Sequence, residues 1–244
     1  AENGKLTDAG NSMSPDIERV MSLNPDAILL SPFENAGYGR IGKMGIPIIE
    51  CADYLETSPL GRAEWIKFFG LLYGKEAEAD SIFTEVEKNY TELRDKIGVL
   101  SSAPVVISEL KSGSAWYMPG GKSYMARFFK DAGAAYPWSD NTETGSIPLS
   151  FETVFNRAGK ADIWLIKSFH VSELSYRTLQ KEYAPYARFK AFREKKIYGC
   201  DSSRCNYYEE TPFRPDLLLQ ELAALFHPGL FPDYRFRYYQ PLSE

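Results

Sequence analysis

The sequence predicts an α/β protein built of two α/β lobes joined by one long rigid helix. Short apolar runs alternate with amphipathic segments on both sides of the middle of the chain, and residues 76–97 keep an unbroken helical period. The 244 residues, 44% of them hydrophobic, suffice for one large or two small domains. The predicted parts are a partial N-terminal lobe (1–57), a helical region with the inter-lobe helix (58–100) and a C-terminal α/β lobe (101–244).

The first lobe is expected to hold one helix and two strands. In the helix, Ser14 is predicted as the N-cap and Pro15 as the first helical residue, within the stretch SPDIERVMSLNP. The apolar runs at 26–31 and 45–51 are typical of strands buried in parallel sheets. The glycine-containing segment between these runs follows the carboxyl end of a strand, where a ligand can bind.

A helical region is predicted from Ser58 to about residue 97, with an interruption at residues 73–76. In its second half, apolar residues recur every three or four positions, with charged residues between them: Ile82, Phe83, Val86, Tyr90, Leu93 and Ile97. At 1.5 Å per residue, a helix over 76–97 is about 33 Å long, close to the diameter of a small domain. We therefore expect it to be a strut between the lobes.

In the second lobe, strand and helix signals alternate again. Apolar runs predict strands, and amphipathic segments with N-terminal Ser or Pro predict helices. The predicted elements are a strand at 103–110, helices at 123–132 and 150–158, a strand at 162–169, a tyrosine-rich helical segment at 172–194, a strand at 196–200 and a helix at 214–226.

Composition argues against several classes of function. The net charge is −5 with mixed signs, whereas a nucleic-acid surface needs clustered Lys and Arg. No run approaches the roughly 18 apolar residues of a membrane span. The two histidines are too few and too scattered for a zinc site or for much His-based catalysis, and no hydrolase or metalloprotease motif occurs. We predict neither an enzyme nor a metal site.

The three cysteines allow two interpretations. Cys51 stands alone, whereas Cys200 and Cys205 lie close together in CDSSRC. In an oxidising compartment the close pair would form a disulfide that closes a small loop. Two reduced cysteines in a turn are equally compatible with the sequence.

The stretch WYMPGGKSYM ends like a phosphate-binding loop. In that motif a glycine stands five residues before the glycine of the GK pair, and here Trp116 takes its place, so nucleotide binding is not expected. Residues 111–122 are instead interpreted as an aromatic loop that follows a strand. We expect Trp116 and Tyr117 to form a stacking platform for a ligand; the alternative is that both rings cap an edge of the core.

Five stretches, in order, resemble the substrate-binding proteins of ABC importers for iron complexes and cobalamin. They are DAGNSMSPDIERVMSLNPDAILLS, LGRAEWIKFFGLLYGKEAEAD, WYMPGGKSYMARFFKDAGA, SIPLSFETVFNRAGKADIW and FRPDLLLQELAALFHPGL. The resemblance implies two α/β lobes bridged by a rigid helix, a ligand cleft between them and a periplasmic or lipid-anchored location. It also implies capture of a ferric siderophore or haem and its delivery to a membrane permease.

The resemblance leaves other functions open. Cobalamin is an alternative ligand within the same family, and a truncated relative that binds only another protein is a further alternative. No cofactor of the protein itself is predicted, although its ligand can contain iron or cobalt. Binding of free metal ions fits less well, because it would need three or four inward-facing His, Asp or Glu ligands.

Two features depart from the family pattern. Family members usually have two further strand–helix units before the point where this chain begins, so the first lobe is expected to be truncated at its N-terminus. They also commonly place one acidic residue on each lobe for docking to the permease. Glu34 matches this position on the first lobe, whereas the second lobe has Lys122 and Ser123 at the matching helix start.

The ligand site is predicted from the loops at the carboxyl ends of strands. Rigid aromatic rings with polar tips cover a large flat ligand at little entropic cost, and the planar guanidinium of Arg204 could pair with an anionic group. His170 is either a structural histidine or a ligand to a haem or cobalt centre. The predicted ligand-binding residues are Phe33, Asn35, Tyr38, Trp116, Tyr117, Tyr124, His170, Tyr176, Arg204, Tyr207 and Tyr208, with Phe169 nearby.

Overall fold

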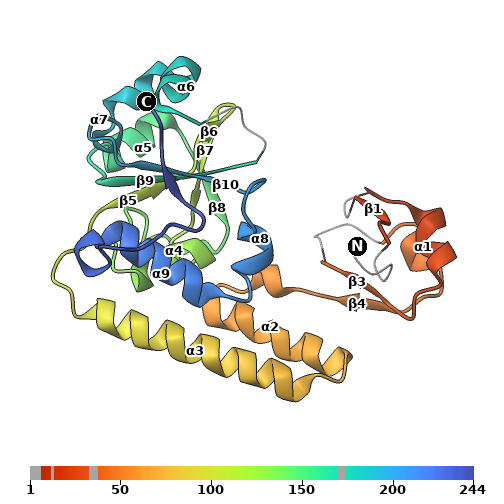
Figure 1. Cartoon of the computed structure of the whole chain (residues 1–244). Coiled ribbons are helices and arrows are strands. Elements are labelled where there is room, and N and C mark those ends of the chain that lie inside the picture. The colour runs from red at the N-terminus through yellow and green to blue at the C-terminus, as the bar shows by residue number, and fades with distance from the viewer. Residues whose placement is uncertain (1–6, 12–13, 33–37, 170–173) are drawn as a thin grey trace. The chain divides into compact units, whose positions relative to one another are not determined.

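A computed structural model describes residues 7–11, 14–32, 38–169 and 174–244 (Figure 1). Helices and sheets alternate along the chain, which confirms the α/β class. The chain divides into two compact units, Ala1–Leu55 and Glu56–Glu244. The helical region predicted over 58–100 belongs to the second unit. The role of its long helix as a strut between lobes stays a prediction. Among the described residues, no helix combines the length and the apolar character that a membrane span requires.

The first unit contains the predicted parallel strand pair. Strands β3 and β4 pair in parallel, with Ile28 opposite Ile48, although Leu29 is 37% exposed. The elements of this unit are β1 (Gly10–Asn11), β2 (Ser14–Pro15), α1 (Ile17–Leu23), β3 (Ile28–Leu30), a 3-10 turn at Ile41–Lys43, β4 (Ile48–Glu50) and a 3-10 turn at Asp53–Leu55.

The start of α1 differs from the prediction. Ser14 and Pro15 form β2, which pairs antiparallel with β1, and the N-cap is Asp16. The Asp16 carboxylate accepts a hydrogen bond from the backbone N–H of Arg19, and its own N–H donates to the carbonyl of Ala9. The second bond holds residues 14 and 15 in extended backbone, so the helix begins after them.

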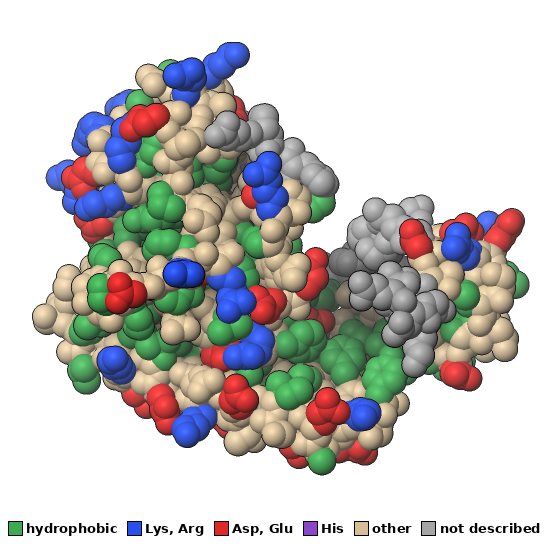
Figure 2. Space-filling model, in the orientation of Figure 1, with side chains coloured by type: hydrophobic (Ala, Val, Ile, Leu, Met, Phe, Trp, Pro, Cys, Tyr) green, Lys and Arg blue, Asp and Glu red, His purple; other side chains and the backbone are tan. Residues whose placement is uncertain are grey.

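The second unit begins with two helices, α2 (Pro59–Leu72) and α3 (Glu76–Gly98), which a short turn at residues 73–75 joins. The break between them falls where the sequence predicts it. Of the predicted apolar face of α3, Phe83, Val86, Tyr90 and Ile97 are buried, whereas Ile82 is 38% exposed. This face packs on α2 and on α9 (Pro215–Phe226). Figure 2 shows acidic and basic side chains mixed along the outer side of α3, as expected for a solvated helix face.

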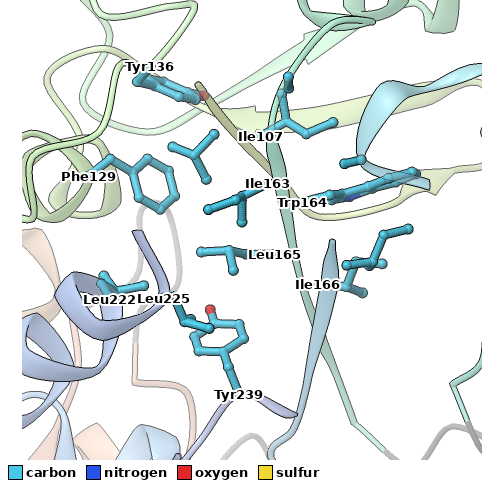
Figure 3. Packing of buried hydrophobic residues seen from close by; sticks show 14 of the residues in the cluster. Ile107, Phe129, Tyr136, Ile163, Trp164, Leu165, Ile166, Leu222, Leu225 and Tyr239 are labelled. Atoms are coloured by element: carbon cyan, nitrogen blue, oxygen red, sulfur yellow. The ribbon is translucent and has the colours of Figure 1, made fainter. Parts of the chain in front are cut away.

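The central sheet of the second unit has the strand order β11–β10–β9–β5. The strands β5 (Val106–Ser108), β9 (Ile163–Ser168) and β10 (Ile197–Asp201) are parallel, and β11 (Gln240–Pro241) pairs antiparallel at the edge. Because side chains alternate along a strand, Ile163 and Leu165 of β9 point toward α4 and α9, and Trp164 and Ile166 point the opposite way (Figure 3). Both faces of the sheet are therefore covered, as in most parallel sheets.

A second, antiparallel sheet of this unit was not predicted. It consists of β6 (Lys111–Ser112), β7 (Ala115–Pro119) and β8 (Ser146–Leu149), in the order β6–β7–β8. The stretch interpreted as an aromatic loop is therefore mostly a strand. Its alternation buries Trp116 and Met118 and leaves Tyr117 half exposed.

Helices α4 and α5 agree with the predicted helices, whereas the short helix α8 is not among the predicted elements and one predicted helical segment is divided. The predicted helix over 172–194 is divided into α6, a 3-10 turn and α7, because Pro185 lacks a backbone N–H donor and disfavours helical backbone before it. The elements are α4 (Tyr124–Asp131), α5 (Phe151–Ala158), α6 (Tyr176–Glu182), the turn Ala184–Arg188, α7 (Lys190–Arg193), α8 (Tyr207–Glu210) and the turn Pro228–Leu230.

The two glycines of the GGKS stretch serve close backbone packing. A Cβ atom on Gly120 would lie 2.3 Å from the carbonyl oxygen of Glu143, and one on Gly121 would lie 2.3 Å from that of Asn141. Neither position has room for a side chain. The following Ser123 is the N-cap of α4, and its hydroxyl accepts a hydrogen bond from the N–H of Ala126 at 3.2 Å. The local sequence is thus explained without a phosphate ligand.

Candidate functional site

A pocket of about 680 Å³ opens at the carboxyl ends of β5 and β9 in the second unit. Residues that follow β5, the end of β9, strand β7, the start of α4 and the start of β8 form its walls. The side chains that give it its chemical character are Glu109, Lys111, Tyr117, Tyr124, Met125, Lys167, Glu182 and Tyr208. Its position is the one that the carboxyl-end rule for parallel strands predicts.

Three of the predicted ligand-binding residues meet in this pocket. Tyr117 from β7 is 50% exposed, and Tyr208 from α8 is 59% exposed. Tyr124, at the first position of α4, donates a hydrogen bond of 3.3 Å to the carbonyl of Thr211, and its ring packs edge-on against Phe128 at 5.0 Å. These contacts hold the Tyr124 ring in place, whereas the other two rings present free surface to the pocket.

Trp116 does not line the pocket, because it is fully buried. Its ring lies 5.3 Å from that of Trp164 and 5.6 Å from those of Tyr186 and Phe189. Strand alternation explains the error: Trp116 and Tyr117 point to opposite faces of β7, so they cannot form one platform. The interpretation of Trp116 as a stacking residue is wrong, because its ring is part of the core.

The two indole groups fix the end of β5. The N–H of Trp116 donates to the carbonyl of Ser108 at 3.0 Å, and the N–H of Trp164 donates to the carbonyl of Glu109 at 2.8 Å. Buried indoles commonly find such partners. Two successive carbonyl groups at the edge of the pocket are therefore held from within the core.

Tyr176 and Tyr207 are also core residues, each 4% exposed. The Tyr176 hydroxyl accepts a hydrogen bond of 3.1 Å from the N–H of Ile197, and the Tyr207 hydroxyl contacts the Met125 sulfur at 3.7 Å. The predicted ligand contacts of these two side chains do not agree with their burial. Tyr207 nevertheless supports the pocket, since its ring packs edge-on against Tyr208 at 5.2 Å.

Of the remaining predicted ligand-binding residues, the structure describes Arg204 and Tyr38. Arg204 has an 86% exposed side chain, pairs with Asp201 at 3.3 Å, and lines a separate pocket of about 630 Å³ together with Arg237. Tyr38 belongs to the first unit, where its hydroxyl donates to the carboxylate of Glu50. Phe33, Glu34, Asn35 and His170 lie outside the described residues, so their predicted roles stay predictions.

The pocket also contains a pair of opposite charges that is not among the predicted site residues. Lys167 of β9 forms an ion pair with Glu109, and the two side chains are only 14% and 25% exposed. Burial lowers the pKa of Lys167, but the charge and the hydrogen bond of Glu109 outweigh this effect, and the net shift is upward. Lys167 therefore stays a cation at neutral pH.

Glu109 is held in an unusual backbone conformation. Its φ is +63°, a left-handed value that costs a non-glycine residue energy and that tends to occur at functional sites. Its N–H donates to the carbonyl of Leu165 at 2.8 Å, while its own carbonyl accepts from Trp164. Both charged residues could have been found from the sequence, since each lies at or next to the carboxyl end of a predicted strand.

No group of three or more His, Cys, Asp and Glu side chains that could hold a metal ion is found in the part of the chain that the structure describes. The pocket offers aromatic surface, phenol hydroxyls, the charged side chains of Lys111 and Glu182, and one partly buried ion pair. Such a set suits noncovalent recognition of an organic molecule.

Comparisons with known proteins agree with this description. The sequence profile of the periplasmic binding proteins matches residues 1–203. An uncharacterized lipoprotein of Methanocaldococcus jannaschii is 31% identical over 239 residues, which are 93% of this chain and 54% of that protein. The chain thus spans about half the length of this relative.

Solved structures show the same fold. The S. aureus protein IsdE complexed with haem has a TM-score of 0.72 at 19% identity, over 93% of this chain and 86% of that one. A periplasmic haem-binding protein from Pseudomonas aeruginosa has a TM-score of 0.70 at 18% identity, over 91% and 78%. The predicted family and its fold are confirmed: the chain belongs to the periplasmic binding protein family.

Proposed function

We propose that this chain is the substrate-binding component of an ABC importer and that it captures an iron complex, either a ferric siderophore or haem. Membership in the periplasmic binding protein family supports a role in solute capture. The haem-binding proteins that share its fold make a large flat chelate a suitable candidate ligand. The captured complex is delivered to a permease in the membrane.

The observation that carries this proposal is the pocket with Tyr117, Tyr124 and Tyr208 on its walls. Its volume of about 680 Å³ lies within the roughly 300–1,000 Å³ of small-molecule sites. Tyrosine offers flat contact area at low entropic cost, together with a hydroxyl that can donate or accept a hydrogen bond. Tyr117 and Tyr208 are the exposed rings and would therefore contribute most of the contact.

The Lys167–Glu109 pair gives the pocket a means of orienting its ligand. Carboxylate groups of a siderophore, or the propionates of haem, can accept hydrogen bonds from the Lys167 ammonium in place of Glu109. Because the pair is largely shielded from water, such an exchange would be stronger than at the open surface.

Ligand titration tests the proposal. Tryptophan fluorescence and visible absorption are followed while haemin, a ferric siderophore or cobalamin is added to the purified chain. We expect saturable quenching with an iron complex, and Tyr117→Ala and Tyr208→Ala should each weaken binding about 5- to 30-fold, in proportion to the loss of an aromatic contact of roughly 1–2 kcal/mol.

Tyr73→Ala is the matched control, because Tyr73 is 69% exposed at the end of α2 and does not line the pocket. It should bind like the unaltered chain. If cobalamin binds saturably and the iron complexes do not, the ligand is cobalamin, the alternative ligand of this family. No binding of any of the three at micromolar concentration would refute the proposed function.

We also propose that the protein is periplasmic and lipid-anchored, in keeping with the naming of its 31% identical relative as a lipoprotein. Cells that lack the chain should lose uptake of the iron complex and regain it with the unaltered gene, but regain less with the Tyr208→Ala variant. Uptake that is unaffected by the deletion would contradict delivery to a permease.

A further inference from the structure

Two thiol groups lie side by side where β10 leads into α8; Figure 1 shows the course of the backbone there. The sulfur atoms of Cys200 and Cys205 lie 3.8 Å apart. Cys200 is fully buried at the end of β10, whereas Cys205 is half-buried in front of α8. Both are free thiols in the structure. A disulfide has an S–S distance of about 2.05 Å, so a relative movement of roughly 1.8 Å would bond them.

The loop already has a closed shape without this bond. The Asp201 carboxylate accepts hydrogen bonds from the N–H of Ser203 at 3.0 Å and from its hydroxyl at 2.7 Å. The N–H of Arg204 donates to the carbonyl of Asp201 at 3.0 Å, and the Cys205 thiol points at the same carbonyl at 3.4 Å. The polypeptide between the two cysteines is therefore fixed in the shape that brings their sulfurs together.

A neighbouring strand holds the loop as well. The N–H and the hydroxyl of Ser202 each donate to the carbonyl of Ser168, both at 3.0 Å. Ser168 is the last residue of β9, which ties the loop to the sheet. These hydrogen bonds hold the loop in the shape in which the two sulfurs lie 3.8 Å apart.

We propose that Cys200 and Cys205 are a redox-active pair that forms an intramolecular disulfide by exchange with a low-molecular-weight disulfide. The half-buried Cys205 loses its proton and attacks one sulfur of the external disulfide, and one thiolate leaves. The Cys200 thiol, after losing its proton, then attacks Cys205 Sγ and displaces the second thiolate. Two protein thiols are oxidised, and one external disulfide is reduced to two thiols.

Burial raises the pKa of both thiols. The reactive thiolate is therefore scarce at neutral pH, so the exchange is slow and the test needs an incubation of hours. Once formed, the bond locks the segment that leads to α8. Tyr208, three residues after Cys205, lines the candidate pocket, so the disulfide fixes one wall of the proposed site.

Peptide mapping gives a direct test. The purified chain is incubated with excess oxidised glutathione, denatured, alkylated and digested with trypsin. Trypsin cleaves after Lys196, Arg204 and Arg235, but not after Arg214, because Pro215 follows it. The disulfide therefore joins two separate peptides, 197–204 and 205–235, and their cross-linked mass is expected. Addition of a reductant before alkylation should separate the two peptides and label both cysteines.

Cys51 provides an internal control, because it lies in the first unit, whose sequence contains no other cysteine. In a Cys51→Ser variant, the cross-linked peptide should form unchanged. The proposal is overturned if both thiols remain open to alkylation after the incubation, if each carries only bound glutathione, or if the cross-link joins two chains.

Thermal unfolding provides a second readout that does not depend on mass. Reduction of the bonded protein should lower its Tm by about 4–8 °C, as expected for opening a six-residue loop in a unit of this size. Cys205→Ser should have the Tm of the reduced protein with or without reductant. An equal response of Cys205→Ser and the unaltered chain to the reductant would also overturn the proposal.

Discussion

The indole N–H of Trp116 donates a hydrogen bond of 3.0 Å to the carbonyl oxygen of Ser108. This contact joins the buried face of β7 to the end of β5, directly before Glu109. Trp116 is thus a structural support of the pocket wall, and its replacement is expected to act on stability. Tyr117, the next residue along the strand, points the other way and is half exposed.

Trp116→Ala is therefore expected to lower the free energy of unfolding by about 3–5 kcal/mol, because it leaves a large cavity in the core. Trp116→Phe should cost about 1–3 kcal/mol, mainly through the lost hydrogen bond to Ser108. Tyr117→Ala should change stability by less than about 1 kcal/mol. Urea unfolding monitored by circular dichroism measures all three; equal losses for Trp116→Ala and Tyr117→Ala would contradict the assigned faces of β7.

Much of the fold follows from the sequence because apolar period and helix caps are local signals. The break between α2 and α3, the strand β9 and the start of α5 all lie within a residue or two of their predicted positions. The strand β7 was missed because its residues, AWYMP, contain a proline and stand beside two glycines, which are typical of loops.

The site was harder to predict, because lining a pocket depends on the direction in which a side chain points. The loop rule led to the correct ends of the strands. Among the predicted residues that the structure describes, however, Trp116, Tyr176 and Tyr207 are buried, and Tyr117, Tyr124 and Tyr208 meet in the pocket. Lys167 and Glu109 were overlooked because charged residues at strand ends are common on protein surfaces. Their pairing depends on the register of β5 and β9, which no local pattern specifies.

A buried hydrogen bond ties the long helix α3 to α4. The Tyr90 hydroxyl donates to the Asp131 carboxylate at 2.8 Å, and that carboxylate also accepts from the Arg127 guanidinium at 2.9 Å. Burial and the adjacent Asp131 charge raise the pKa of Tyr90, so the phenol remains a donor. Tyr90→Phe should lower the free energy of unfolding by about 1–2 kcal/mol.

Chemical denaturation checks this value, and Tyr73→Phe serves as the control because its side chain is largely exposed at the end of α2. The control should differ from the unaltered chain by less than about 0.5 kcal/mol. A Tyr90→Phe variant as stable as the control would show that the bond to Asp131 contributes nothing.

The close backbone packing at Gly121 gives a further prediction. A Cβ atom there would lie 2.3 Å from the Asn141 carbonyl oxygen and 2.4 Å from that of Trp138, and both are backbone atoms that cannot turn away. Gly121→Ala should therefore lower stability by about 1–3 kcal/mol. Gly98→Ala, where no atom lies within 4 Å of the added Cβ, should be neutral or slightly stabilising. The Tm values of the two variants are measured by thermal unfolding. Equal Tm values would refute the role of Gly121 in close backbone packing.

The acid sensitivity of the fold should depend on Asp162. Its carboxylate accepts hydrogen bonds from the Lys190 ammonium at 2.6 Å and from the N–H of Val105 at 2.8 Å. Burial raises the pKa of Asp162, but the hydrogen bonds from Lys190 and Val105 together lower it by more, so the net shift of the pKa is downward. The folded state therefore binds a proton less readily than the unfolded state.

The lowered pKa of Asp162 in the folded state sets the sign with which the free energy of unfolding depends on pH. The stability that Asp162 contributes is fully present above its unfolded pKa of about 3.9 and is lost as the pH falls through the lower folded pKa. Asp162→Asn should cost about 1 kcal/mol at pH 7, because it removes the charged partner of Lys190. The difference between the two proteins should shrink as the pH falls below about 4, and urea unfolding from pH 7 to pH 2.5 would reveal it. A constant difference across this range would mean that the ion pair with Lys190 does not set the acid response.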